Sequence, residues 1–398
     1  MKPAGWFFAA LSAAAVIGLS ACGASCDSTA RVAGMPVIAA GSFDAVATDQ
    51  GAHRLYLADR VAQGVDVVDI GPSTPRFVGT VVLGAGANGL AVAPEQHRVY
   101  AAVEGGNIAV IDSRTLAVLS TTRVDPTSAD LVDYSPATRS LYVGSGNDVV
   151  VLDTTNQVVS RRITAPSPLE QPRYDPADGK LYVTAPKMDS LLQFDPATGK
   201  VTRTYVLPKC HPTGLAINPS RQLAMLACGS SIGFVNLRSG ASAVTQKVQG
   251  GDIATYDPGA DRFIVASPHD SGSSAIGVFT GDGTFVGSVS ALPTVHGAAF
   301  DDAHGVVYAP GKGGLMSFAP AACAAPPDWV PFLAGLSLFV VPMLAAAAFL
   351  LYVAWRRDHP RVAPSGPTYE QLVEEDLTFE RERMHALEDG IFGPEVAP

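Results

Sequence analysis

Tyr182-Val183-Thr184-Ala185, preceded by Lys180 and Leu181, is a short stretch in which apolar residues flank a tyrosine. The same pattern recurs at intervals of roughly 42 residues, which is the length of a four-stranded β-propeller blade. In two copies Ala224 and Ile264 replace the tyrosine. The central residues of the seven copies are at positions 56, 100, 142, 182, 224, 264 and 308. The chain is therefore predicted to be all-β, a seven-bladed β-propeller with four antiparallel strands per blade.

Each copy also contains the other strands of a blade. An innermost strand precedes the tyrosine strand, and in several copies it ends with Asp, Asn or Ser before Pro, as in Leu215-Ala216-Ile217-Asn218-Pro219. Such residue pairs start tight turns. A third strand such as Ile108–Asp112 and a fourth such as Val201–Val206 follow. These stretches are too short for helices and are rich in β-branched residues, as strands are.

The two ends of the repeat array indicate how the ring closes. The seventh copy lacks a fourth strand, whereas residues 31–40, before the first copy, align with the fourth strand of the other copies. We predict that this N-terminal strand completes the last blade. Closing the ring in this way removes open sheet edges, which would otherwise invite aggregation.

The repeats resemble the YVTN family of β-propellers. The resemblance lies in Tyr182-Val183-Thr184-Ala185, in Tyr142-Val143-Gly144-Ser145 and in the third-strand motif Val110-Ile111-Asp112, and it covers about Arg31 to Pro320. Copy five departs most, with Ala224 and Asn236 in place of Tyr and Asp. The resemblance implies an exported or surface protein of bacterial type and says little about a ligand.

The N-terminus is typical of an export signal. Lys2 is followed by the apolar run Trp6–Gly18, which is too short to span a membrane comfortably. Leu19-Ser20-Ala21-Cys22 resembles the lipobox of bacterial lipoproteins. Two outcomes stay open: lipidation of Cys22, or ordinary cleavage near Ala21.

The C-terminal region contains a predicted transmembrane helix. Trp329 to Trp355 holds no charged residue, and Arg356 and Arg357 follow directly. Because positive flanks stay in the cytoplasm, the tail should lie inside and the propeller outside the inner membrane. We expect a signal peptide over residues 1–21, the propeller over 27–320, a linker over 321–328, the helix over 329–355 and an acidic cytoplasmic tail over 356–398.

The charge distribution restricts the kinds of partner. The net charge is −10 and no basic cluster is present, which argues against nucleic acid. The tail is either a solvated segment or a docking segment for a cytoplasmic partner. Outside, the partner is expected to be a protein or a small-molecule ligand.

The five cysteines fit an exported protein with disulfides. Cys26 precedes the closing strand and Cys323 follows the third strand of blade seven, so a Cys26–Cys323 bridge would lock the ring. Cys210 and Cys228 lie in two loops expected on one face, and a Cys210–Cys228 bridge is predicted there. Free buried thiols are the alternative for each pair.

The residues that begin the innermost strands should ring the mouth of the central channel, where propellers usually bind ligands. His211 lies close to one of them in sequence, and with His296 it is a candidate ligand of a divalent cation. Polar residues that merely line a solvated channel are the alternative. By repeat alignment the mouth residues are Asp44, Asn88, Asp130, Glu170, Thr213, Asp252 and His296.

No catalytic set can be assembled from the sequence. It has no Gly-x-Ser-x-Gly elbow, no His-Glu-x-x-His motif and no glycine-rich phosphate loop. A binding or scaffold module at the cell surface is therefore favoured. The alternative is an enzyme of lyase or hydrolase type with a metal-dependent site at the channel mouth, because resembling seven-bladed propellers include such enzymes.

Overall fold

The computed structural model describes residues 30–31, 43–270, 273–320, 329–358 and the single positions 374, 378, 381 and 382. The chain divides into two compact units, residues 1–325 and 326–398. The predicted signal peptide, Cys22, the Cys26–Cys323 bridge and the linker over 321–328 lie outside the described residues.

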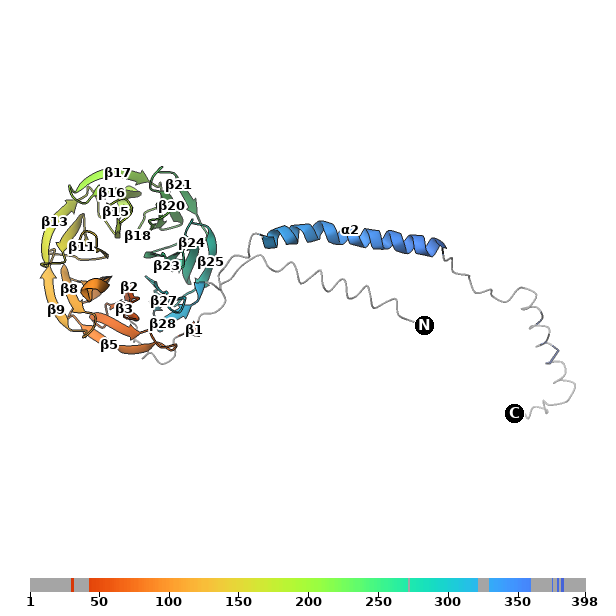
Figure 1. Cartoon of the computed structure of the whole chain (residues 1–398), viewed down its shortest axis with the longest axis horizontal. Helices are drawn as coiled ribbons and strands as arrows, with labels where there is room; N and C mark the ends of the chain where they lie inside the picture. Colours follow the sequence, from red (N-terminus) through yellow and green to blue (C-terminus); the bar gives the residue numbers. More distant parts are fainter. Residues whose placement is uncertain are drawn as a thin grey trace, which may run out of the picture. The chain divides into compact units, whose positions relative to one another are not determined.

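The described part of the first unit consists of seven four-stranded antiparallel sheets around a central axis (Figure 1). In six of the sheets the strands follow in sequence order from the axis outward. The predicted seven-bladed propeller with four strands per blade is confirmed.

The first four blades have innermost strands of four to seven residues. A 3₁₀ turn follows the first strand of blade two, η1 (Pro94–Gln96), and the second strand of blade four, η2 (Pro186–Met188). The strands are β2 (Phe43–Asp49), β3 (Arg54–Asp59), β4 (Gly64–Asp69) and β5 (Arg76–Val82); β6 (Ala87–Ala93), β7 (Arg98–Val103), β8 (Asn107–Asp112) and β9 (Val118–Arg123); β10 (Val132–Ser135), β11 (Ser140–Ser145), β12 (Asp148–Asp153) and β13 (Val158–Thr164); and β14 (Pro172–Asp175), β15 (Lys180–Ala185), β16 (Ser190–Asp195) and β17 (Lys200–Val206).

The last three blades complete the ring, and blade seven takes its outer strand from the N-terminal side of the chain. Their strands are β18 (Gly214–Asn218), β19 (Leu223–Ala227), β20 (Ile232–Asn236) and β21 (Ser242–Thr245); β22 (Ala254–Asp257), β23 (Arg262–Asp270), β24 (Ser273–Thr280) and β25 (Phe285–Ser290); and β26 (Ala299–Asp301), β27 (Val306–Gly311), β28 (Gly314–Phe318) and β1 (Ala30–Arg31).

The ring closes as predicted. β1 pairs antiparallel with β28, with Ala30 opposite Ser317 and Arg31 opposite Met316. Residues 32–40, the rest of the predicted closing segment, lie outside the described residues. The last blade is thus completed by a strand from the opposite end of the domain sequence, which covers part of the outer edge of β28.

The core lies between neighbouring blades. Tyr100 of β7 and Tyr142 of β11 are almost fully buried, and each packs against the innermost strand of the next blade. The ring centroids of Tyr100 and Tyr134 are 6.0 Å apart, and those of Tyr142 and Tyr174 are 5.8 Å apart. Burial of one such aromatic side chain stabilises the fold by roughly 2–3 kcal/mol.

Blade five differs from the sequence prediction in register. Asn218 pairs with Leu223 and Ala216 with Met225, as Ser135 pairs with Ser140 and Asp133 with Tyr142 in blade three. Met225, rather than Ala224, therefore takes the tyrosine position. The turn supports this alignment, because Gln222 has φ 52° where Arg139 has φ 49°. The predicted repeat position in blade five was wrong by one residue, since Leu223, Ala224 and Met225 are all apolar.

The predicted Cys210–Cys228 disulfide is confirmed. It joins the loop before β18 to the loop after β19. Both residues are buried and their Cα atoms are 4.7 Å apart. A crosslink that closes a loop of this length stabilises a protein by roughly 3 kcal/mol, mainly by restricting the unfolded chain.

The described part of the second unit is mainly the helix α2 (Trp329–Asp358), which has Arg356 and Arg357 in its last turn. A search of the described residues finds no helix with both the length and the apolar character needed to cross a membrane.

Candidate functional site: the central channel

The residues predicted at the mouth in blades three to six share one backbone hydrogen bond. At this position the backbone N–H donates to a carbonyl of the second strand of the same blade, at 2.8 to 3.0 Å. The shared bond makes the four positions structurally equivalent. The donors are Asp130, Glu170, Thr213 and Asp252, and their acceptors are Gly144, Thr184, Ala227 and Ala266.

Arg60 belongs to the mouth, although the sequence prediction missed it. It lies in the turn after β3, and its Nη2 forms an ion pair with Oδ2 of Asp44. Its Nε donates to Oδ1 of Asn88 at 2.9 Å, and Nδ2 of Asn88 donates to the carbonyl of Ala129 at 3.1 Å. The turns between the second and third strands lie at the same end of the channel as the mouth. A basic residue in such a turn is therefore the sequence feature that could have indicated Arg60.

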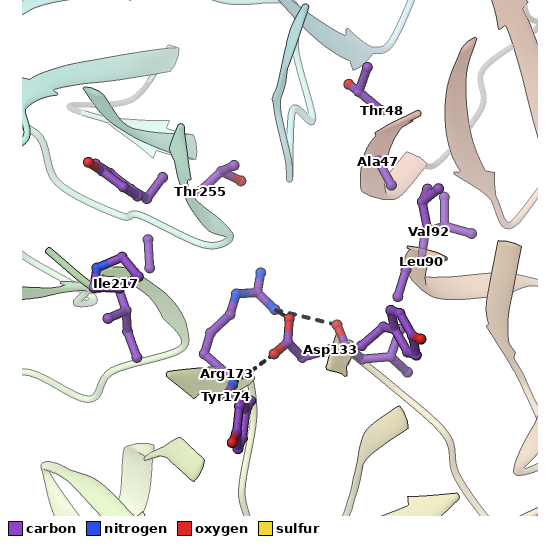
Figure 2. Close-up of a pocket in the computed structure, with 15 residues that line it drawn as sticks. Ala47, Thr48, Leu90, Val92, Asp133, Arg173, Tyr174, Ile217 and Thr255 are labelled. Atoms are coloured by element: carbon purple, nitrogen blue, oxygen red, sulfur yellow. Dashed lines mark hydrogen bonds and ion pairs between the residues drawn. The ribbon is translucent and has the colours of Figure 1, made fainter. Parts of the chain in front are cut away.

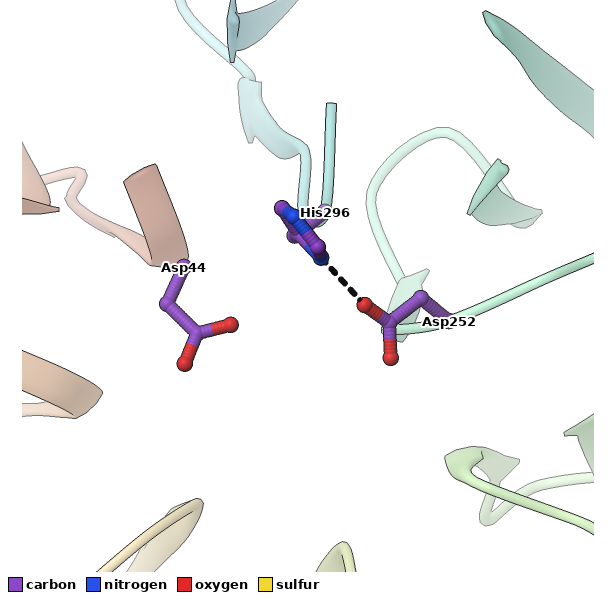
Figure 3. A group of neighbouring side chains, drawn as sticks. All are labelled: Asp44, Asp252 and His296. Carbon is purple, nitrogen blue, oxygen red and sulfur yellow. Dashed lines mark hydrogen bonds and ion pairs between the residues drawn. The ribbon is translucent and has the colours of Figure 1, made fainter. Parts of the chain in front are cut away.

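Asp44, Asp252 and His296 form a compact group at the mouth (Figure 3). One oxygen or nitrogen atom from each lies within 4.8 Å of those of the other two. Nδ1 of His296 is 2.6 Å from Oδ2 of Asp252. The three residues come from blades one, six and seven, which are consecutive around the ring. Carboxylate oxygens and an imidazole nitrogen at this spacing are suited to a divalent metal ion.

The mouth carries more negative than positive charge. Burial raises the pKa of Asp44 to about 7, although Arg60 opposes the shift. Burial also raises the pKa of Glu170 to about 7, and the carboxylates of Asp130, Asp252 and Asp44 add to the effect. Among the described residues, Asp130 and Glu170 have no basic partner within ion-pair distance. A cation at the mouth would relieve this repulsion.

His296 is held by its carboxylate partner. The hydrogen bond with Asp252 raises the pKa of His296, and burial opposes the shift. Without a metal, this bond fixes the imidazole orientation through Nδ1. A metal ion bound by both side chains would take the place of the proton that Nδ1 and the carboxylate share.

The side chains of His211 and Thr213, two of the predicted site residues, have partners outside the group formed by Asp44, Asp252 and His296. His211 is 67% exposed, and its Nδ1 is 3.0 Å from Oδ1 of Asp189. It is not part of the group formed by Asp44, Asp252 and His296 within the described residues. The hydroxyl of Thr213 donates to the carbonyl of Gly251 at 3.2 Å. His296 therefore lies in this group with two carboxylates, and His211 does not.

A cavity of about 350 Å³ lies farther along the channel, among the innermost strands (Figure 2). Arg173 of β14 and Asp133 of β10 are the charged residues of its lining. The sequence prediction missed both. Each lies three residues after the mouth residue of its blade, so the repeat alignment could have identified these positions as well.

Comparisons with known proteins give no family. No protein-family model matches the chain, and no curated protein matches it. The resemblance to the YVTN family therefore stays a prediction from the repeat motifs. The candidate function rests on the channel geometry.

Proposed function

We propose that the propeller is a ligand-binding module whose channel mouth binds a divalent metal ion through Asp44, Asp252 and His296. The observation that carries the proposal is the spacing of their ligand atoms, all within 4.8 Å of one another. Imidazole and carboxylate ligands suit Zn²⁺ and Mn²⁺. Asp130 and Glu170 add negative charge nearby.

Arg60 would compete with this metal ion for the carboxylate of Asp44. Its guanidinium pairs with Asp44, but its side chain is 36% exposed and long enough to turn toward solvent. A metal ion would replace the guanidinium as the partner of Asp44, and Arg60 would keep its bond to Asn88 or move away. The charge of Arg60 should lower the metal affinity of the wild-type protein.

Metal titration of the full chain tests the proposal. After treatment with a chelator, the protein in detergent is titrated with Zn²⁺ and Mn²⁺ by calorimetry. His296→Gln and Asp252→Asn should each weaken binding by at least about 10-fold. His304→Gln is the matched control, because Nδ1 of His304 also contacts a carboxylate, Oδ2 of Asp301, at 2.8 Å.

The outcomes are distinct. The control should bind as the wild type does, since His304 and Asp301 are not part of a group of three ligands within the described residues. Absence of stoichiometric binding, or equal binding by His296→Gln and the wild type, would refute the metal site.

An enzyme is the second candidate, and one observation favours it. Three protein ligands leave a coordination position for water or substrate, as in catalytic zinc sites. Glu170 has a pKa raised to about 7, in the range that suits a general acid or base. A metal-dependent lyase or hydrolase would use this pair of features, and Glu170→Gln would then abolish turnover without removing the metal.

We also propose that the propeller is displayed outside the cytoplasm and anchored by the residues of α2. The Cys210–Cys228 disulfide supports export, because disulfides persist in oxidising compartments. The uncharged run from Trp329 to Trp355 and the arginines after it support the anchor and an inside tail that could meet a cytoplasmic partner. Lipid at Cys22 would be a second anchor.

Protease treatment of intact spheroplasts checks this location. The propeller should be digested and the tail after Arg357 should be protected, with the full chain in the membrane fraction. A protected propeller, or recovery of the chain in the soluble fraction, would contradict the proposed topology.

A further inference from the structure

The seven blades can be compared at one equivalent position of the innermost strand, beside the cavity. The residue three positions after each mouth residue faces its partner in the second strand, and in five blades it is small. Only blades three and four carry a charge there. The seven residues are Ala47, Ala91, Asp133, Arg173, Ala216, Thr255 and Ala299.

The small residues leave room in the channel, and the two charged residues extend into it. In Figure 2 the guanidinium of Arg173 points into the space between the innermost strands. The side chain of Arg173 is 24% exposed and that of Asp133 is 23% exposed. The cavity of about 350 Å³ is within the usual range of small-molecule sites.

Only part of the hydrogen-bonding capacity of the Arg173 guanidinium is used by the described residues. Its Nη1 donates to the carbonyls of Pro172 at 3.0 Å and Val132 at 3.4 Å. Among the described residues, no hydrogen-bond partner faces its Nη2 or Nε. These two groups form the edge that binds a carboxylate through two parallel hydrogen bonds.

Asp133 does not use this edge. Its Oδ1 is 3.7 Å from Nη1 of Arg173, which is beyond hydrogen-bond distance. Its Oδ2 instead accepts the backbone N–H of Tyr174 at 2.7 Å. The two charges thus neutralise each other at a distance, and the guanidinium edge stays available.

Stability gives little reason for this pair. A partly buried ion pair without a direct hydrogen bond is weak evidence of stabilisation, because desolvation offsets much of the Coulomb attraction. The other five blades use uncharged residues at this level and form the same sheets. The departure of two adjacent blades from the pattern is better explained by a ligand.

We infer that Arg173 is the anchor of a second binding site, inside the channel, for a small organic carboxylate. The walls formed by Ala47, Ala91 and Ala216 suit a small apolar body, and Arg173 suits its carboxylate. The lining includes Thr48 and Pro219, near the ends of their strands, so the cavity reaches toward the channel end opposite the mouth.

This site is separate from the proposed metal site. Asp133 and Arg173 each follow the mouth residue of their blade by three positions, and three steps of extended backbone span about 10 Å. The inference therefore stands or fails without the metal, and its test is carried out in the presence of a chelator.

The test uses benzoate and succinate as probes, with benzamide and succinamide as uncharged analogues. Binding to the full chain is measured by calorimetry and by saturation-transfer NMR. The carboxylates should bind and the amides should bind at least about 10-fold more weakly. Arg173→Gln should weaken carboxylate binding by a similar factor, and His296→Gln should leave it unchanged.

Two further variants separate a ligand site from a structural ion pair. Arg203→Gln is the matched control, because Arg203 also donates to backbone carbonyls, those of Leu237 and Arg238, but outside the cavity. Asp133→Asn removes the competing negative charge, so it should tighten carboxylate binding several-fold if the variant keeps its circular dichroism spectrum.

Each possible result either supports or refutes the carboxylate site. Carboxylate binding that depends on Arg173 and is tightened by Asp133→Asn supports the site. No carboxylate binding, equal binding of acids and amides, unchanged binding by Arg173→Gln, or weakened binding by a folded Asp133→Asn protein would overturn it.

Discussion

The tyrosine position of the second strand and the mouth position of the innermost strand lie twelve residues apart in every blade, yet they differ in kind. The tyrosine position is occupied by Tyr in five blades and by Met225 and Ile264 in the others. The mouth position varies from carboxylate to amide, hydroxyl and imidazole. Packing between blades restricts the first position, whereas the second faces the channel and is free to carry chemistry.

The energetic consequences of the two positions are opposite. Tyr56, Tyr100 and Tyr182 are fully buried, so they contribute directly to stability. The mouth gathers carboxylates such as Asp44 and Glu170, whose pKa values burial raises to about 7. At neutral pH these groups are partly ionised and repel one another, and the fold tolerates that cost at a site suited to binding.

The largest effect is expected when one residue of each kind in blade three is substituted. Tyr142→Ala should lower the free energy of unfolding by about 3–5 kcal/mol, because it leaves a cavity beside Tyr174 and removes the stacked pair. Asp130→Asn should leave stability unchanged or raise it, since burial raises the pKa of Asp130 and an amide carries no charge.

Denaturant unfolding of both variants and the wild type, with metal removed, measures the difference. Tyr142→Phe is the control for side-chain size. It loses the polar contacts of the hydroxyl, including the one with Thr138 at 3.2 Å, and should cost far less than the alanine variant. Equal losses for Tyr142→Ala and Asp130→Asn would show that the two positions do not differ as we argue.

The fold was predictable because burial in a propeller is periodic. Leu141, Tyr142 and Val143 show the alternation and spacing that a second strand requires, and the missing fourth strand of blade seven pointed to the N-terminal strand β1. Blade five was misaligned because Leu223, Ala224 and Met225 are all apolar. The hydrogen-bonded register distinguishes them, and the hydropathy pattern does not.

The site was only partly predictable. The repeat assigns Asp252 and His296 to the same position in successive blades, and the structure brings their side chains together. It did not indicate that Arg60, from a turn of blade one, would pair with Asp44. It also did not separate His211, whose loop backbone has φ 48° and directs it to Asp189. Loop conformation and side-chain reach lie outside what a repeat pattern specifies.

The smallest expected effect concerns the pH dependence of stability, and Glu170 provides its test. Burial first, and then the carboxylates of Asp130, Asp252 and Asp44, raise the pKa of Glu170 to about 7. The folded protein thus holds the proton of Glu170 more tightly than the unfolded chain. This stabilisation is complete below the unfolded pKa of about 4 and is lost as the pH rises through about 7.

The thermal midpoint of the metal-free protein should therefore fall by a few degrees between pH 5 and pH 8, and the fall should be smaller in Glu170→Gln, which keeps the shape of the side chain but cannot ionise. Glu374→Gln, at an exposed position of the second unit, is the control and should keep the wild-type slope. Saturating Mn²⁺ should also reduce the fall, because a bound cation offsets the repulsion that ionised Glu170 feels. An unchanged slope in Glu170→Gln would mean that the mouth carboxylates do not oppose folding, and the contrast between the mouth and the tyrosine positions would then be one of residue type alone.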